Sequence, residues 1–255
     1  MAERKRIHII QYGLGQVGRA LLGQVLAGRE RLAARTGLEL RPVALIDSGG
    51  WLASSQGIDD GTLRQALELK AGGVGLGRQP EGQPRRGREP VELAGLRGPV
   101  IVVDVTAADG MEAVALEALA KGWGLVVANK RPLAGPLETS QRLLGSRRLR
   151  YEATVGAGLP WVETLTHLLD TGDQVWRVEA AVSGTLGFVI SQLEAGVAFS
   201  TAVAGAQAQG YSEPDPRDDL CAADVRRKGL ILARTLGQAL NWDDLPAEPL
   251  DPPAW

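Results

Sequence analysis

A glycine-rich turn near the start of the chain constrains the fold more than any other feature. An apolar stretch, residues 7–12, runs into Gly-Leu-Gly-Gln-Val-Gly, and a helical pattern follows. A G-x-G-x-x-G string is weak evidence alone, but between a buried strand and a helix it is typical of dinucleotide-binding βαβ units. The alternative is a glycine turn that binds no ligand, which the two flanking elements disfavour. The predicted cofactor-binding residues in this turn are Gly13, Leu14, Gly15, Gln16, Val17 and Gly18.

Each glycine of this turn has a different physical role. Gly13 allows the tight turn, and Gly15 lets the backbone approach a pyrophosphate. Gly18 lets the helix pack close to the strand, so that the amides at the helix N-terminus face the phosphates.

The second predicted strand, residues 40–46, ends at Asp47. An acid at this position of a βαβ unit can accept the ribose hydroxyls of NAD, whereas NADP carries a phosphate there. Asp47 comes somewhat later than the usual offset of about 20 residues. We therefore predict NAD or NADP as the cofactor, with Asp47 as a cofactor-binding candidate.

Strand and helix patterns alternate over the first half of the chain, which predicts a parallel sheet covered by helices. Residues 71–98 are rich in Gly, Arg and Pro and are predicted as an irregular loop. Ligands of open α/β sheets bind beyond the carboxyl ends of the strands, so Asp47, Thr106 and Lys130 are expected at one crevice. The predicted elements are helix 19–35, strand 40–46, helix 57–70, strand 99–108, helix 110–121 and strand 124–128.

Composition and charge favour a soluble cytoplasmic enzyme that acts on a small molecule. The chain has 255 residues and a formal net charge of −2, which argues against a general role on nucleic acid or membrane surfaces. No apolar run is long enough to cross a bilayer. The single cysteine, Cys221, excludes an intramolecular disulfide and is predicted to be a buried small residue. His8 and His167 are predicted to be structural, because two separated histidines do not make a metal site.

A short Pro-rich stretch, residues 210–219, carries four acids and leads into a helical pattern. The spacing places Asp224 and Lys228 on one face of that helix. Carboxylates can hold an ammonium group while a lysine beside them delivers a proton, so the cluster suits a small zwitterionic substrate. The alternative is a solvated, capped helix start with a surface ion pair, which is what most charge runs are.

The second half of the chain begins at residues 151–160, where a short strand breaks into a glycine turn. A helix is predicted over residues 161–170 and a strand over residues 174–182. Two further helices, one ending at residue 194 and one over residues 201–209, precede the acidic stretch. These elements predict an α+β domain.

Four segments together resemble the homoserine dehydrogenase family over nearly the whole length of the chain. The glycine turn is generic, but the other three together are specific. The resemblance implies an NAD(P)-dependent oxidoreductase that interconverts L-aspartate 4-semialdehyde and L-homoserine, on the route to threonine and methionine. The specific segments are Asn129-Lys130-Arg-Pro-Leu, Tyr151-Glu-Ala-Thr-Val-Gly-Ala-Gly-Leu-Pro160, and Gly210-Tyr-Ser-Glu-Pro-Asp-Pro-Arg-Asp-Asp-Leu with Asp224-Val-Arg-Arg-Lys228.

The resemblance also implies roles for single residues. Lys228 would donate a proton to the aldehyde oxygen, with Asp224 beside it and Lys130 as the second lysine of the site. The chemistry agrees, because hydride arriving at the aldehyde carbon leaves negative charge on oxygen that an ammonium stabilises and protonates. Thr106 and Lys130 would lie near the nicotinamide. The substrate-binding acids would be Glu213, Asp218 and Asp219.

Two further expectations come from the family alone. One is a monovalent cation, Na+ or K+, in the turn that follows residue 151. The backbone carbonyls of Val155, Ala157 and Leu159 would be its ligands, and Glu152 would complete the shell. The other is a homodimer or higher homo-oligomer.

The predicted fold class is α/β, with a Rossmann-type parallel sheet in a nucleotide-binding domain followed by the α+β domain. The resemblance implies that this second domain serves substrate binding and dimerisation. The predicted domains are residues 1–132, residues 133–240 and a Pro-rich tail, residues 241–255. The usual family chain continues past the point where this sequence stops, so the second domain is expected to be incomplete at its C-terminus.

Two other functions remain open at this point. One is a catalytically impaired dinucleotide-binding or sensing relative of the enzyme, against which the retention of Lys130, Asp224 and Lys228 argues. The other is a different NAD(P) dehydrogenase acting on a related amino-acid aldehyde. Such an enzyme would share the glycine turn but not the acidic stretch.

Overall fold

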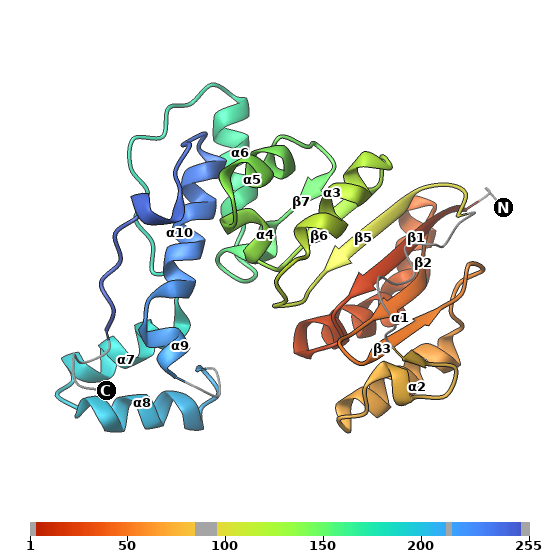
Figure 1. Cartoon of the computed structure of the whole chain (residues 1–255), viewed down its shortest axis with the longest axis horizontal. Helices are drawn as coiled ribbons and strands as arrows, with labels where there is room; N and C mark the ends of the chain where they lie inside the picture. The colour runs from red at the N-terminus through yellow and green to blue at the C-terminus, as the bar shows by residue number, and fades with distance from the viewer. Residues whose placement is uncertain (1–3, 85–95, 213–215, 251–255) are drawn as a thin grey trace. The chain divides into compact units, whose positions relative to one another are not determined.

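The computed structural model describes residues 4–84, 96–212 and 216–250, and the chain divides into two compact units. Unit 1 contains the chain up to Asn129 together with residues 146–151, and unit 2 contains residues 130–145 and the chain from Glu152 onward (Figure 1). The predicted boundary at residue 132 lies close to the first of these divisions. No helix in the described part of the chain is both long and apolar enough to span a membrane.

Unit 1 is built around a seven-stranded sheet in the order β4-β3-β2-β1-β5-β6-β7. The strands from β2 to β7 in this order run parallel, and β3 and β4 add an antiparallel edge. The predicted Rossmann-type parallel sheet is confirmed. The strands span Lys5–Tyr12 (β1), Leu38–Ile46 (β2), Gly50–Ala53 (β3), Gln83–Pro84 (β4), Val100–Asp104 (β5), Gly124–Val127 (β6) and Leu149–Arg150 (β7).

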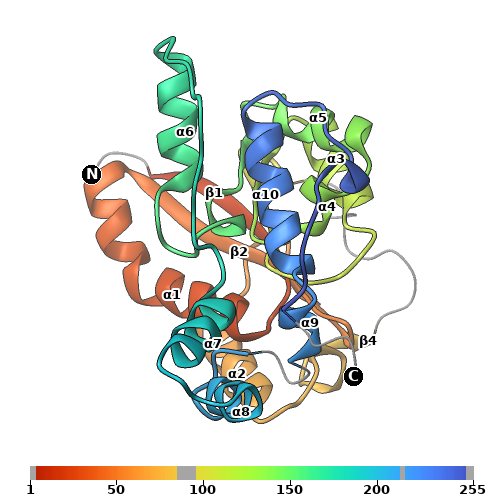
Figure 2. The ribbon, with the colours of Figure 1, turned by 90° about the vertical axis from the view of Figure 1, so that its left-hand side faces the viewer.

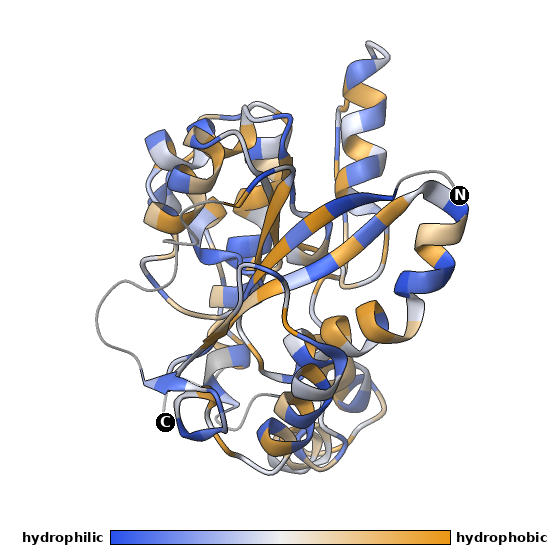
Figure 3. Ribbon diagram, turned by 90° about the vertical axis from the view of Figure 1, so that its right-hand side faces the viewer, coloured by the Kyte–Doolittle hydropathy of each residue, from blue (hydrophilic) through white to orange (hydrophobic). Residues whose placement is uncertain are grey.

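The carboxyl halves of the central strands are buried and largely hydrophobic (Figure 3). Such continuous apolar runs are typical of a parallel sheet covered on both faces. The strand order reverses at β1, with β2 on one side and β5 on the other, and ligands of open α/β sheets bind at such a switch point. Val105 N donates to Tyr12 O at 2.9 Å, so the segments that leave β1 and β5 start in contact.

The described part of unit 1 contains three α-helices: α1 Gln16–Thr36, α2 Asp60–Ala71 and α3 Glu112–Ala120. They confirm the three helices predicted for this half of the chain. α1 and α2 share a core with the sheet through Leu22, Leu45 and Leu63, which are almost fully buried. The segment predicted to be irregular, residues 71–98, includes a 3-10 helix, η1 (Leu76–Arg78), and β4; residues 85–95 lie outside the described residues.

Unit 2 is helical in its described part. α7 and α8 lie side by side (Figure 2) and pack around Val189, Val203 and Leu220. α10 packs against α4, α5 and α6. The elements of unit 2 are α4 Arg131–Ala134, α5 Leu137–Leu144, η2 Glu152–Thr154, α6 Trp161–Asp170, α7 Gly184–Glu194, α8 Phe199–Ala208, α9 Arg217–Leu220, α10 Ala223–Thr235 and η3 Trp242–Asp244.

Two predictions for the second half of the chain are wrong. Residues 174–182 do not form a strand, and Trp176 in this segment is 90% exposed. A strand needs a hydrogen-bonded neighbour, and the described part of unit 2 supplies none. Cys221 is exposed rather than buried, because it lies in the break between α9 and α10.

The Pro-rich end of the chain packs on α10 within its described part. The guanidinium carbon of Arg226 lies 4.4 Å from the centroid of the Trp242 ring, and the same side chain donates to Trp242 O. Further on, Leu250 N donates to Leu220 O at 2.9 Å. Residues 251–255 lie outside the described residues.

Candidate active site

The glycine turn of unit 1 has two positions at which no other residue fits. Gly13 adopts φ +98°, and a Cβ there would lie 2.8 Å from Val105 O. A Cβ on Gly18 would lie 2.2 Å from Gly13 O, so the first turn of α1 rests directly on the turn before it. Both approaches are shorter than real Cβ contacts, and φ near +98° is accessible chiefly to glycine. The predicted roles of these two glycines therefore have a direct geometric basis.

The N-terminus of α1 is open to a ligand. Gly15 precedes the helix, no side chain caps it, and a Cβ at Gly15 would meet nothing within 4 Å. Val17 in the first turn is 56% exposed. Uncapped amides and the positive end of the helix dipole form a binding site for an anion such as a pyrophosphate.

A buried polar network closes the carboxyl ends of β5 and β6. Asp104 Oδ1 accepts hydrogen bonds from Thr106 N at 3.0 Å and Thr106 Oγ1 at 2.7 Å, and Asn129 Nδ2 donates to Asp104 Oδ2 at 3.0 Å. Burial raises the pKa of Asp104 above its ordinary value, and the hydrogen bonds from Thr106 and Asn129 only partly offset it. The network fixes the backbone and hydroxyl of Thr106, the residue predicted to lie near the nicotinamide.

Asp47 ends β2 as predicted, but its carboxylate is directed into unit 1. Oδ1 accepts from Gly49 N at 2.7 Å and Gly50 N at 2.9 Å, while Oδ2 pairs with Lys70 and accepts from Leu76 N at 3.1 Å. Burial alone would raise the pKa of Asp47, but the hydrogen bond from Lys70 and the backbone amides hold it below its ordinary value. Its carboxylate therefore organises the segment after β2, and a ribose contact by Asp47 stays a prediction.

The three predicted catalytic residues come together in unit 2. Asp224, in the first turn of α10, accepts Lys228 Nζ at 2.6 Å through Oδ2 and Lys130 Nζ at 3.1 Å through Oδ1. Lys228 also donates to Val182 O at 2.6 Å. The predicted helical face is confirmed, and the cluster carries two positive charges against one negative charge.

The pKa of Asp224 is lowered despite partial burial of the residue. Burial by itself would raise this pKa, but the hydrogen bond from Lys228 and the charge of Lys130 outweigh it. Asp224 is therefore ionised at neutral pH and orients both ammonium groups.

The acidic stretch is described only in part. Glu213 and the side chain of Asp218 lie outside the described residues. The single O–H of Thr185 is shared between two acceptors, Tyr211 O at 2.5 Å and Asp219 Oδ1 at 3.2 Å. Thr185 thus ties the start of α7 to both ends of the stretch.

The turn predicted to bind a cation starts at Glu152, whose carboxylate already accepts two backbone hydrogen bonds. Glu152 Oε1 accepts from Val162 N at 2.9 Å and Oε2 accepts from Glu163 N at 2.8 Å, so this side chain caps α6. Ala157 adopts φ +53°, an uncommon conformation for alanine, and Leu159 is 61% exposed. No group of three or more His, Cys, Asp or Glu side chains that could hold a metal ion occurs within the described ranges.

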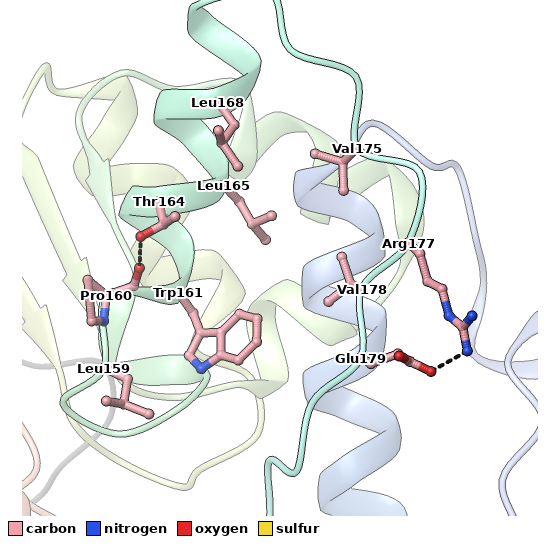
Figure 4. A pocket seen from close by; sticks show the side chains of 10 residues that line it. All are labelled: Leu159, Pro160, Trp161, Thr164, Leu165, Leu168, Val175, Arg177, Val178 and Glu179. Carbon is pink, nitrogen blue, oxygen red and sulfur yellow. Dashed lines mark hydrogen bonds and ion pairs between the residues drawn. The ribbon is translucent and has the colours of Figure 1, made fainter.

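A groove of about 480 Å³ lies between α6 and the irregular segment that follows it. Figure 4 shows Trp161 and Leu165 on one wall and Val175 and Val178 on the other. The charged residues of its lining, Arg177 and Glu179, pair with each other and are largely exposed. The groove is apolar, and its lining offers neither a buried acid nor an ammonium group for proton transfer.

Two family models match the chain, and together they cover most of it. Residues 13–152 match the model described as homoserine dehydrogenase, NAD binding domain, and residues 160–252 match the model described as homoserine dehydrogenase. The chain belongs to the homoserine dehydrogenase family. The two matches meet near the glycine-rich segment after residue 151, where the chain enters unit 2 for the second time.

Named relatives of this chain are longer proteins. The bifunctional aspartokinase/homoserine dehydrogenase 2, chloroplastic, of Zea mays is 36% identical over 245 residues, which cover 94% of this chain and 26% of the relative. The homoserine dehydrogenase of Emericella nidulans is 37% identical over 171 residues, covering 63% of this chain and 46% of the relative. The chain therefore spans about a quarter of the plant protein and less than half of the fungal one.

Solved structures of the family share the fold. A hyperthermophilic archaeal homoserine dehydrogenase in complex with NADPH superposes with a TM-score of 0.76 at 27% identity. The match covers 91% of this chain and 70% of the archaeal chain.

Sequence reasoning did not assign a role to three polar residues that hold the candidate site. Gln11 is buried inside β1 and its Nε2 donates to Gly13 O at 2.9 Å and Gly18 O at 3.0 Å. Asn129 holds Asp104 at the end of β5, and Thr185 holds the start of α7 to the acidic stretch. A polar residue within an otherwise apolar stretch is the sequence signal for Gln11, because a buried amide requires partners.

Proposed function

We propose that this chain catalyses the NAD(P)-dependent interconversion of L-aspartate 4-semialdehyde and L-homoserine. The observation that carries the proposal is the pairing of Lys130 and Lys228 on the single carboxylate of Asp224. Membership of the homoserine dehydrogenase family supports it. Reduction of a carbonyl by hydride from a nicotinamide is assisted by a proton donor at the carbonyl oxygen, and a lysine ammonium can be that donor.

Lys228 is the proposed proton donor to the aldehyde oxygen. An ammonium group has three N–H donors, and Asp224 Oδ2 and Val182 O accept two of them. The third donor is the one we assign to the substrate oxygen. Lys130, held by the other oxygen of Asp224, adds a second positive charge that stabilises the developing alkoxide.

Glu213, Asp218 and Asp219 are the proposed anionic partners of the substrate's amino group. Support comes from their place in the family motif and from the hydrogen bond that links Asp219 to Thr185. Carboxylates beside a lysine pair would suit a zwitterion, since the substrate has an ammonium group as well as a carboxylate.

The proposed cofactor is NAD or NADP, which supplies or accepts the hydride when bound. The glycine turn, the uncapped start of α1 and Thr106 fit such a group: the turn leaves open space at Gly15 where backbone can approach a pyrophosphate. If Asp47 accepts the ribose hydroxyls, Asp47→Asn should weaken NADH binding and leave NADPH binding unchanged. Fluorescence titration with both cofactors measures this.

A monovalent cation and a homo-oligomer remain proposals that rest on the family resemblance. Glu152 has lone pairs beyond the two that accept backbone amides, so it can still bind Na+ or K+ together with the carbonyls of Val155, Ala157 and Leu159. Activity titrated with each ion tests the cation, and light scattering on the purified chain tests the oligomer.

The deciding experiment is NAD(P)H oxidation by the purified chain with L-aspartate 4-semialdehyde. Lys228→Ala should abolish turnover and keep cofactor binding. Lys121→Ala is the matched control, because Lys121 is a partly exposed lysine at the C-cap of α3 in unit 1, where it contacts Glu117 and the Trp123 ring. Normal turnover in Lys228→Ala would overturn the assignment, and absence of turnover in the wild type with cofactor bound would favour an impaired relative.

A further inference from the structure

Arg234, in the last turn of α10, inserts its guanidinium between α10 and the segment around α4. Nη1 donates to Leu133 O and to Gly135 O, each at 2.8 Å, and Nε donates to Leu240 O at 3.0 Å. The residue is only 6% exposed. All three acceptors are neutral backbone carbonyls, so the planar guanidinium acts here as a set of hydrogen-bond donors and not as a partner for a negative charge.

The burial of Arg234 indicates that its guanidinium has a structural role. Desolvation lowers the pKa of its guanidinium, which shows that the protein environment disfavours the charge. In some proteins a buried charge is retained because its hydrogen bonds fix one geometry that an apolar residue could not fix. The planar guanidinium can bridge several carbonyls in fixed directions, which a flexible ammonium cannot do.

Two of the three carbonyls that Arg234 holds, those of Leu133 and Gly135, belong to the segment that begins at Lys130. Lys130 precedes α4, and its carbonyl accepts Leu133 N at 3.2 Å and Ala134 N at 2.9 Å. Ser140 Oγ donates to the same Leu133 carbonyl at 2.8 Å. The backbone of Lys130 and the carbonyl of Leu133 therefore form one compact turn with donors attached at its far end.

This turn and α10 are joined at two points. At the start of α10, Lys130 Nζ pairs with Asp224. At the end of α10, Arg234 holds Leu133 and Gly135. The rise of 1.5 Å per residue places these two points about 15 Å apart along the helix, so together they fix both the position and the direction of the turn.

We propose that Arg234 is a positioning residue, which locks the turn bearing Lys130 onto α10 and so sets how Lys130 and Lys228 share the carboxylate of Asp224. The inference rests on the proposed function, since the geometry it sets is that of the proposed proton donor. The three hydrogen bonds of Arg234 described above all go to backbone carbonyls and not to the side chains of the cluster.

The test compares Arg234→Met and Arg234→Lys with Arg227→Met as matched control, because Arg227 lies on the same helix and its guanidinium carbon lies 5.7 Å from the Trp242 ring centroid. The purified chains, without substrate, are treated with an amine-acylating reagent, and mass spectrometry gives the rate at each lysine. Arg234→Met should raise the rate at Lys130 several-fold, because the Lys130–Asp224 pair loosens, and leave Lys121 unchanged. Arg234→Lys should give an intermediate rate, and Arg227→Met the wild-type rate.

Kinetics provide a second readout. Displacing a catalytic group by about 1 Å can cost about a hundredfold in rate, so kcat should fall at least tenfold in Arg234→Met while cofactor affinity stays constant. If Arg234→Met does not fold, Ser140→Ala, which removes the other donor to Leu133 O, should raise Lys130 acylation to a smaller extent.

Unchanged acylation of Lys130 and Lys228 in a folded Arg234→Met variant would overturn the proposal, whatever happens to kcat. Because acylation is measured without substrate, this result is distinct from failure of the proposed reaction. The two proposals can also fail separately. If the wild-type chain shows no turnover but Arg234→Met still speeds acylation of Lys130, the dehydrogenase assignment is wrong and the positioning role of Arg234 stands.

Discussion

Asp224 accepts Lys228 through Oδ2 at 2.6 Å, one helical turn further along α10. The other oxygen of the same carboxylate accepts Lys130 at 3.1 Å, from a segment far away in the sequence. One negative charge thus orients two positive ones and leaves the cluster with a net positive charge. Such a cluster stabilises an oxygen anion that forms beside it.

Asp224→Asn should impair turnover while leaving the cofactor site intact. The amide keeps the shape of the side chain but removes the charge that orients both lysines, so we expect kcat to fall about a hundredfold. Steady-state kinetics and NADPH fluorescence titration measure the two effects separately. Asp243→Asn is the control, because the Asp243 side chain is 98% exposed. Wild-type kcat in Asp224→Asn would contradict the assigned role.

Two glycine substitutions in α1 should have opposite effects. In Gly18→Ala the new methyl group would meet Gly13 O, so we expect a loss of stability of about 1–3 kcal/mol and loss of cofactor binding. In Gly23→Ala the methyl group meets nothing within 4 Å, and the free energy of unfolding should rise by about 1 kcal/mol. Urea unfolding and cofactor titration of both variants test this pair. If the two variants had the same stability and the same cofactor affinity, α1 would not pack closely on the glycine turn at Gly18.

Asp47 gives the stability of the chain a pH dependence of known sign. Hydrogen bonds hold its pKa below the ordinary value of 3.8. A carboxylate whose native pKa is lowered stabilises the fold fully above its unfolded pKa and loses that contribution as the pH falls through its native pKa. The wild type should therefore lose stability as the pH drops below about 4.

Asp47→Asn should lack this part of the pH dependence. At neutral pH we expect the variant to be less stable by about 2 kcal/mol, because Lys70 and Leu76 N lose their acceptor. Urea unfolding at successively lower pH should show the gap to the wild type narrowing below about pH 4. A gap that is independent of pH would contradict the prediction. Asp173→Asn, at an exposed position, serves as control.

Ala222, immediately before α10, has φ +59° and is a site where glycine should be tolerated. The left-handed conformation costs alanine about 1–2 kcal/mol, which offsets the entropy that glycine adds to the unfolded chain. Ala222→Gly should therefore leave the free energy of unfolding unchanged or raise it by up to about 1 kcal/mol. Ala204→Gly, at an exposed position inside α8, should lower it by about 1 kcal/mol. Thermal unfolding of both variants distinguishes these outcomes.

The sequence predicted the parts of this molecule that depend on local periodicity. The glycine turn after β1 and the helical face with Asp224 and Lys228 follow from residue spacing, and both are present. The sequence could not predict Arg234 as a link to Leu133, because that contact joins positions that are distant in the chain. Asp47 was placed correctly at a strand end, but its partner Lys70 depends on how α2 packs. The strand predicted at residues 174–182 had the right composition but lacks a neighbour among the described residues of unit 2.

Unit 1 completes its sheet with β7, which the chain reaches only after residues 130–145 have joined unit 2. The polypeptide therefore crosses between the units after Asn129, after Gly145 and after Tyr151. A nucleotide-binding fragment that ended at Asn129 would expose β6 as a new edge, with unpaired backbone groups open to aggregation. Each unit is compact in space, but each is built from two separate stretches of the chain that alternate in the sequence. A recombination that exchanged unit 1 between relatives would have to carry residues 146–151 together with the chain up to Asn129.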